Sequence, residues 1–377
     1  MKAIYILIVF CIASSCKKQA ENSIDVIKII VDMKTSKAKS IETIFSAIEA
    51  VPLETTENSL LKRCGKIICN DDKYYILDEG QNAIFIFDMQ GHFLKNSMHK
   101  EGRGPGEYLS IVDFDINPQT GHIEILDVSA YKIRRYDEDF NFMNETTIPQ
   151  TLYPITTFKI VTSDLLVFYS PRNDINDKLL LYSVYKNEVV GRFNIQSIKH
   201  RLPITQKYSF YMRDSDLFFT NRYPSNYIFQ ILYNEKKIKE CVEFNFGKNT
   251  FRITNTSKTV LENNSSTEMN NDQFVFPYTK HENDFSYFSF VEFKNELHLV
   301  SYNKESKLTK VVPCKFTDGG MILPPKFVDN IYFYVLAEPH WIDEMAKKTL
   351  LNSRSQEVIK TLKEDDNPIL LKYKLIH

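Results

Sequence analysis

The residues that could do chemistry gather between positions 102 and 115. Residues 102–106 read GRGPG, the densest glycine cluster in the chain. A dinucleotide-binding fingerprint needs a glycine where Glu107 stands and a helix after it, whereas a P-loop ends in Gly-Lys-Ser or Gly-Lys-Thr. Neither pattern is present, so the sequence predicts no nucleotide site. Glycine accepts positive φ and proline fixes φ, which favours a tight turn here.

Two carboxylates follow this turn and could hold a metal ion. Asp113 and Asp115 flank Phe114, so in a strand they share one face. They could equally accept hydrogen bonds from neighbouring turns, and the sequence leaves both interpretations open. A His-Glu-x-x-His motif and an Asp-x-Asp-x-Asp-Gly calcium loop are both missing. None of the eight histidines lies within five residues of another. We therefore predict no cofactor, and a bound Ca or Zn belongs only to an alternative hypothesis.

The sequence contains no motif for nucleophilic catalysis and no charge pattern for nucleic-acid binding. A Gly-x-Ser-x-Gly nucleophile elbow is absent. The 47 Lys and Arg residues are interspersed with 48 Asp and Glu residues, for a formal net charge of -1. We therefore expect no nucleic-acid partner. The aromatic runs at 287–290 and 332–334 could stack on sugars, although such runs more often pack between sheets.

The elements that must position these residues are β-strands. The chain of 377 residues has 27 Phe and 21 Tyr but only 11 Gly, a composition that favours pleated, half-buried surfaces. Residues 71–98 and 117–146 repeat one strand-turn-strand phrase, in which Asp78 and Asp127 correspond, 49 residues apart. Weaker copies occupy 163–195, 214–246, 285–316 and a last unit from 327. A repeat of about 40–50 residues with four strands is typical of a propeller blade.

The sequence therefore predicts an all-β, six-bladed β-propeller of four-stranded blades. Residues 254–284 are rich in Asn, Ser and Thr and predict a long exposed loop between blades. Residues 341–363 predict a helical excursion near the C-terminus, with one face shared by Ile342, Met345, Ala346, Thr349 and Leu350. The stretch 24–55 is expected to supply a strand to the last blade and so close the ring.

Residues 101–136 resemble an NHL repeat, with a Gly-x-Gly-Pro-Gly-Glu-Tyr loop followed by Gly-x-Ile-x-Ile-x-Asp. Over residues 25–377 the chain resembles the six-bladed β-propeller lipoproteins of Bacteroides-type bacteria. Four segments carry this resemblance, at 51–55, 102–108, 113–116 and 363–368. The resemblance implies a fold and a cellular location, but it implies no substrate.

The N-terminus reads as an export signal. The apolar run Ala3–Ala13 has eleven residues, which span about 16 Å as a helix, half of a bilayer core, so it predicts a secretory signal and not a membrane span. The tetrapeptide at 13–16, ASSC, resembles a bacterial lipobox, which implies cleavage and a lipidated Cys16. The alternative is a plain signal peptide with a chance cysteine. We expect a signal peptide at 1–15, a tether at 16–24 and one propeller domain at 25–377.

The location that this resemblance implies is the outer membrane. Lys17 and Lys18 follow the cysteine, where surface-export tags of the resembled lineage are acidic, so the periplasmic side is favoured over the cell surface. Export permits disulfides. Cys64 and Cys69 could form a bridge or remain as free thiols.

Two functional hypotheses follow. In a propeller the loops between blades gather on one face, and Arg103, Glu107, Tyr108, Asp113 and Asp115 are the candidate binding face. The first hypothesis is a monomeric, non-enzymatic binding or scaffold lipoprotein that recognises a glycan, a peptide or an envelope protein, with no catalytic residue. The alternative is a metal-assisted lyase or lactone hydrolase with Ca or Zn in the central channel. A fold does not decide between them.

Overall fold

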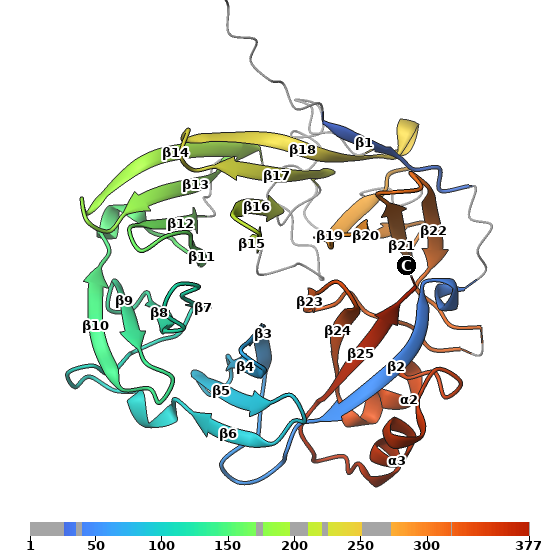
Figure 1. Cartoon of the computed structure of the whole chain (residues 1–377), viewed down its shortest axis with the longest axis horizontal. Coiled ribbons are helices and arrows are strands. Elements are labelled where there is room, and N and C mark those ends of the chain that lie inside the picture. The colour runs from blue at the N-terminus through green and yellow to red at the C-terminus, as the bar shows by residue number, and fades with distance from the viewer. Residues whose placement is uncertain are drawn as a thin grey trace, which may run out of the picture.

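The structure is a computed structural model in which six β-sheets surround a central axis (Figure 1). It describes residues 26–34, 40–170, 176–196, 210–220, 225–250, 273–317 and 319–376. In four sheets, antiparallel strands that follow one another in the chain are ordered from the axis to the rim, and in the other two a strand from the N-terminal region is added at the rim. The protein is therefore a six-bladed β-propeller, and the fold predicted from the repeat is confirmed.

The first three blades have four strands each. Blade 1 contains β3 (Cys64–Asn70), β4 (Lys73–Asp78), β5 (Ala83–Asp88) and β6 (Phe93–Asn96). Blade 2 contains β7 (Asp113–Ile116), β8 (Ile123–Asp127), β9 (Lys132–Tyr136) and β10 (Phe142–Thr147). Blade 3 contains β11 (Thr157–Ile160), β12 (Leu165–Ser170), β13 (Asn176–Ser183) and β14 (Glu188–Gln196).

The other three blades include the two strands from the N-terminal region. Blade 4 contains β15 (Phe210–Arg213), β16 (Asp216–Thr220), β17 (Tyr227–Leu232), β18 (Lys237–Asn245) and the added β1 (Ile27–Ile30). Blade 5 contains β19 (Phe276–Glu282), β20 (Ser286–Phe293), β21 (Glu296–Asn303) and β22 (Thr309–Pro313). Blade 6 contains β23 (Phe327–Val328), β24 (Tyr332–Ala337), β25 (Ile369–Leu375) and β2 (Phe45–Pro52).

Short helices connect some of these strands. The 3-10 turns are η1 (Ile41–Thr43), η2 (Met98–Lys100), η3 (Gln150–Leu152), η4 (Gly247–Asn249) and η5 (Pro339–Trp341). The two α-helices, α2 (Ile342–Met345) and α3 (Ser353–Thr361), lie between β24 and β25. This is the predicted helical excursion. Within the described part of the chain, no helix is long and apolar enough to cross a membrane.

Neighbouring blades pack face to face, so their middle strands are buried on both faces. Tyr75, Leu77 and Ile84 of blade 1 form one cluster with Phe114 and Ile125 of blade 2. Both β4 and β5 are buried over almost their whole length. This explains why apolar runs such as AIFIFD at 83–88 lack strict alternation, because neither face of the sheet meets water.

The ring closes in blade 6, where a strand from the N-terminal region pairs with the last strand of the chain. The rim strand β2 pairs antiparallel with β25, with Pro52 opposite Ile369. The sequence predicted this closure. It did not predict β1, which pairs in parallel with β18 at the rim of blade 4, with Ile27 opposite Val242. Between these strands, the backbone N–H of Ile41 donates to the carbonyl of Lys315, beyond the end of β22. The N-terminal region therefore contacts blades 4, 5 and 6 in turn.

The repeated aspartates Asp78 and Asp127 have the same structural role in blades 1 and 2. Asp78 ends β4, and its carboxylate accepts hydrogen bonds from the backbone N–H groups of Lys62 and Arg63, at 2.6 and 3.1 Å, ahead of β3. Asp127 ends β8 and accepts from the N–H of Leu109 at 2.9 Å, ahead of β7. The residues 49 apart in the sequence thus secure the incoming inner strand of their own blade.

Two segments that carried the family resemblance meet in space. Asn367 precedes β25 and is 1% exposed. Its side-chain oxygen accepts from the N–H of Leu61 at 2.7 Å, and its amide group donates to the carbonyls of Glu54 and Ser59 at 2.8 Å each. The 363–368 and 51–55 segments are therefore one hydrogen-bonded unit that joins the last blade to the first.

Two sequence predictions need correction. The loop predicted at 254–284 is too long, because residues 276–282 form β19, the inner strand of blade 5; positions 254–272 lie outside the described residues. The helical face predicted at 341–363 is interrupted. Ile342, Met345 and Ala346 are buried, but α2 ends at Met345 and Thr349 is exposed. A break after one turn removes the 3.6-residue period that would place Thr349 on the buried face.

The cysteines of blade 1 are free. Cys64 and Cys69 lie at different positions along β3 and form no bridge. Burial raises the pKa of the Cys64 thiol to about 12, so this thiol stays protonated and unreactive at neutral pH. Cys241 and Cys314 are also free.

Candidate functional site

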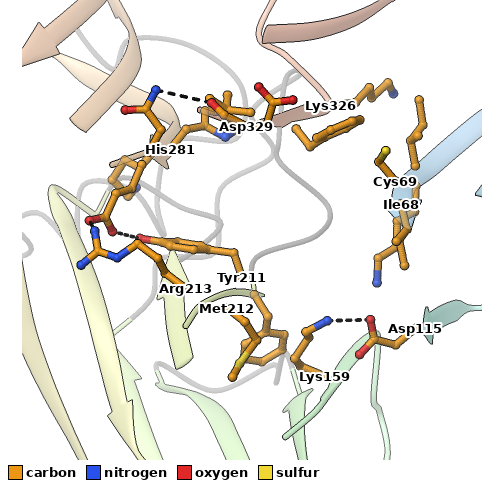
Figure 2. Close-up of a pocket in the computed structure, with 18 of the residues that line it drawn as sticks. Ile68, Cys69, Asp115, Lys159, Tyr211, Met212, Arg213, His281, Lys326 and Asp329 are labelled. Carbon is orange, nitrogen blue, oxygen red and sulfur yellow. Dashed lines mark hydrogen bonds and ion pairs between the residues drawn. The ribbon is translucent and has the colours of Figure 1, made fainter. Parts of the chain in front are cut away.

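The six inner strands enclose a central channel with a cavity of 740 Å³. Residues of β3, β7, β11, β15, β19 and β23 all line it. Its charged lining comprises five cations, Lys66, Lys159, Arg213, Lys280 and Lys326, and five carboxylates, Asp115, Asp214, Glu282, Asp284 and Asp329. Which of these charges neutralise one another decides what the channel can bind (Figure 2).

Blades 1 to 3 contribute a surface that we name the paired wall, made of Lys66, Asp113, Asp115, Thr157 and Lys159. Asp113 on β7 is fully buried. Its carboxylate accepts from Nζ of Lys66 on β3 at 3.0 Å. It also accepts from the hydroxyl of Thr157 and from the backbone N–H of Phe158, the latter at 2.9 Å. One side chain therefore joins the inner strands of three blades.

Asp115, two residues after Asp113 on β7, makes similar contacts in the paired wall. Its carboxylate accepts from Nζ of Lys159 at 2.7 Å and from the backbone N–H of Ile160 at 2.9 Å, both on β11 (Figure 2). Asp115 is 1% exposed. The interpretation of Asp113 and Asp115 as hydrogen-bonded structural carboxylates fits these contacts better than the interpretation as metal ligands. Among the residues that the structure describes, no group of three or more His, Cys, Asp or Glu side chains could hold a metal ion.

A second ion-pair cluster joins blades 4 and 5 around Glu282 at the end of β19. Its carboxylate accepts from the hydroxyl of Tyr211 at 2.8 Å and from Nζ of Lys304 at 2.6 Å, and it pairs with the guanidinium of Arg213 (Figure 2). The Glu282 side chain is 1% exposed. Burial, together with the charge of Glu282, raises the pKa of Tyr211 well above its ordinary value, so this tyrosine remains a hydrogen-bond donor.

The two residues before Glu282 differ from both clusters, and we name them the Lys280–His281 site. Lys280 is 1% exposed, and its Nζ donates to the backbone carbonyl of Ser225 at 2.7 Å. Within the described ranges, no carboxylate forms an ion pair with it. Burial lowers the pKa of Lys280 to about 7, because the charged form loses its hydration.

His281 completes this site. It is 6% exposed, and its Nε2 has no hydrogen-bond partner among the residues that the structure describes. Burial, and secondarily the charge of Lys280, lower the pKa of His281 to about 3. The imidazole is therefore neutral at physiological pH, with one nitrogen able to donate and one able to accept. Both Lys280 and His281 line the cavity.

The structure separates the five residues predicted to form a binding face. Arg103 is exposed on the loop between β6 and β7. The Glu107 carboxylate accepts from the N–H of Gly104 at 2.6 Å and so stabilises its own loop. Tyr108 is fully buried, and its hydroxyl donates to the carbonyl of Ser97 at 2.8 Å. These three do not line the channel cavity. Only Asp113 and Asp115 are brought together, in the paired wall.

The glycines of this loop are explained by the same contacts. A Cβ at Gly102 would lie 2.0 Å from a carboxylate oxygen of Glu107, and Gly106 has φ +75 and packs against Phe142. The hydroxyl of Tyr136 donates to the Gly106 carbonyl at 3.0 Å. The predicted tight turn between an outer and an inner strand is therefore present.

Sequence reasoning missed Lys280 and His281 because it assigned their segment to a loop. The preceding run, Val275-Phe276-Pro277-Tyr278, is apolar and stands where blade 5 needs an inner strand. That position in the repeat was the available signal. The hydrogen-bond partner of Lys280, Ser225, belongs to blade 4 and left no local pattern.

The fold and its lined channel define the class of protein, a six-bladed propeller with a central cavity. The chain belongs to the family of the domain of unknown function DUF4934, whose model matches residues 24–374. A comparison with curated protein sequences gives no match.

Solved structures show the same fold. An exported protein of Bacteroides fragilis has a TM-score of 0.71 at 17% identity, covering 94% of this chain and 100% of that one. A member of the DUF4221 family from Bacteroides vulgatus has a TM-score of 0.52 at 11% identity, covering 88% and 96%. Virginiamycin B lyase from Staphylococcus aureus has a TM-score of 0.38 at 13% identity, covering 70% of this chain and 73% of that one. This similarity is too weak to indicate a shared function.

Proposed function

We propose that the protein is a non-enzymatic binding protein of the cell envelope that takes a small glycan or peptide into its central channel. The cavity of 740 Å³ carries this proposal. Pockets for small molecules fall at about 300–1,000 Å³ and combine apolar walls with a few oriented polar groups. This channel combines Phe210, Met212 and Phe327 with the charged residues of the paired wall and of the Lys280–His281 site.

A lipid on Cys16 would hold this propeller at the outer membrane, on its periplasmic side. The lipobox resemblance at 13–16 supports this part of the proposal; these positions lie outside the described residues. The ten residues between Cys16 and Ile27 reach about 36 Å at most when fully extended. The rim of blade 4, where β1 lies, would then face the membrane more closely than the rest of the ring.

Ligand binding is tested on the detergent-solubilised full-length protein by thermal unfolding with panels of glycans and short peptides. A ligand at 100 times its Kd stabilises the native state by about 2.7 kcal/mol. We expect Met212→Trp, which narrows the cavity, to abolish the shift in melting temperature. Leu308→Trp, a matched substitution at a side chain that is 64% exposed, should retain it. Equal shifts in both variants would place the binding site elsewhere.

The anchor is tested separately by fractionation. Cys16→Ala should release the protein from the membrane fraction, and protease added to intact cells should leave the wild-type protein uncut if it faces the periplasm. Retention of Cys16→Ala in the membrane would refute the lipid anchor without affecting the channel.

A further inference from the structure

The cations of the channel differ in whether a carboxylate neutralises them. Lys66 pairs with Asp113, with 3.0 Å between Nζ and the carboxylate oxygen. Lys159 pairs with Asp115 at 2.7 Å, and Arg213 pairs with Glu282. Lys280 is more buried than these three cations, yet within the part of the chain that the structure describes its Nζ has only the Ser225 carbonyl as a hydrogen-bond acceptor.

An uncompensated buried lysine is costly, because desolvation disfavours its charged form and no nearby anion offsets that loss. Buried charges without a partner are expected at functional sites, where a ligand can supply the missing partner. An ammonium group has three N–H donors. One donates to Ser225, so two are available to an acceptor that enters from the channel.

His281 provides an independent sign of a missing partner. Its Nε2 is buried and makes no hydrogen bond to any described residue, although it lines the same cavity. A buried nitrogen without a partner destabilises the protein, because it has lost its hydrogen bonds to water. Lys280 and His281 are adjacent on β19, so their side chains leave opposite faces of the strand, and the charge of Lys280 helps to lower the pKa of His281. The wall of the channel thus presents two nitrogen donors, and no anion among the described residues satisfies them.

We propose that Lys280 binds the carboxylate group of a small ligand in the central channel, and that His281, on the other face of β19, forms a hydrogen bond to a second polar group of that ligand. This inference rests on the proposed function and names the chemistry of its ligand. A carboxylate oxygen would accept from the Lys280 ammonium, and such charge-assisted hydrogen bonds are roughly twice as strong as neutral ones.

The first test needs no ligand and compares Lys280→Met with Lys159→Met in the full-length protein. Removing Lys280 deletes an unpaired buried charge, so its melting temperature should rise. Removing Lys159 leaves Asp115 buried without its ion-pair partner, so its melting temperature should fall. A fall for Lys280→Met as large as that for Lys159→Met would mean that Lys280 is structural, and the inference would be overturned.

The second test uses matched acidic and neutral probes, measured by thermal shift and calorimetry. Tri-galacturonic acid is compared with its methyl ester, and triglycine with its C-terminal amide. The acids should bind wild type and bind Lys280→Met about 10- to 100-fold more weakly, the effect of losing a charge-assisted hydrogen bond. His281→Leu, which removes both ring nitrogens, should weaken the binding of the acids as well. If only the galacturonic acid pair shows this difference between acid and ester, the ligand carboxylate belongs to a sugar. If only the triglycine pair shows it, the carboxylate belongs to a peptide.

The remaining outcomes separate this inference from the proposed function. If acid and neutral forms bind equally well, or if Lys280→Met binds the acids as tightly as wild type, the channel binds ligands but does not recognise a carboxylate there. If no probe at 100-fold excess over protein shifts the melting temperature of wild type, the result counts against both proposals.

Discussion

The paired wall and the Lys280–His281 site face the same channel, but lysines are paired with carboxylates in the first and Lys280 has no carboxylate partner among the described residues in the second. In the paired wall, Asp113 and Asp115 accept hydrogen bonds from Lys66, Lys159 and two backbone N–H groups of β11. In the Lys280–His281 site, the described residues offer one backbone carbonyl and no carboxylate. A charge that is paired with a residue of a neighbouring blade holds the two blades together, whereas the role that we propose for the unpaired Lys280 is to bind a ligand.

The largest effect should come from deleting residues 369–377. This removes β25, which pairs with both β24 and β2 and closes blade 6. Without it, neither the paired wall nor the Lys280–His281 site is held in a closed ring. We expect urea unfolding monitored by circular dichroism to lose its cooperative transition. A truncated protein with a cooperative transition near that of wild type would show that closure of blade 6 is dispensable.

Asp113→Ala should be the most damaging single substitution in the paired wall. It leaves the Lys66 ammonium, on a side chain that is 13% exposed, without its ion-pair partner, and breaking a buried pair costs about 3–5 kcal/mol. Chemical denaturation gives the free energy of unfolding. Lys66→Met combined with Asp113→Ala is the control, because removing both charges should restore part of the loss. A loss below about 1 kcal/mol for Asp113→Ala would mean that the wall does not hold the blades together.

Stability should depend on pH through Lys280. Its pKa is about 7 when folded against an ordinary value of 10.5, so between these values the unfolded chain binds more protons and stability rises with pH. From pH 7.5 to 9 the free energy of unfolding should increase by about 2 kcal/mol more in wild type than in Lys280→Met, since one pKa unit is worth about 1.4 kcal/mol. Below pH 7 the difference between the two proteins should level off.

This comparison isolates Lys280 from its neighbours. Burial also lowers the pKa of Lys304, but that slope is common to both proteins and cancels. His281 titrates far below the window, and the pKa of Tyr211 lies well above it. Parallel stability curves for wild type and Lys280→Met from pH 7.5 to 9 would contradict a desolvated lysine.

Arg103→Ala should have the smallest effect. Arg103 is exposed on its loop and does not line the channel, and surface substitutions of this kind stay within about 0.5 kcal/mol. Neither the melting temperature nor the affinity for any channel ligand should change. A marked loss of affinity would mean that the ligand binds at the loop that contains Arg103, as the sequence predicted.

Much of the fold could be predicted from the sequence because its signals are local. Asp88 accepts hydrogen bonds from the N–H groups of Gln90 and His92, each at 2.9 Å, and Asp137 does the same for Asp139 and Asn141 at 2.9 and 2.8 Å. Such turns need specific residues a few positions apart, so they recur in the sequence as the blades recur in space. The blade count followed from this repetition, and the helical excursion followed from the apolar residues that share one helical face between 342 and 350.

The sequence by itself determined the all-β class, the repeat and the tight glycine turn, because periodicity and turn chemistry act over a few residues. Only the tertiary structure decided which charges meet. Lys66 finds Asp113 across 47 positions and Lys159 finds Asp115 across 44, whereas Lys280 finds no carboxylate among the described residues. Ion pairing depends on which inner strands become neighbours around the axis, and that arrangement exists only once six separate sheets have closed into a ring.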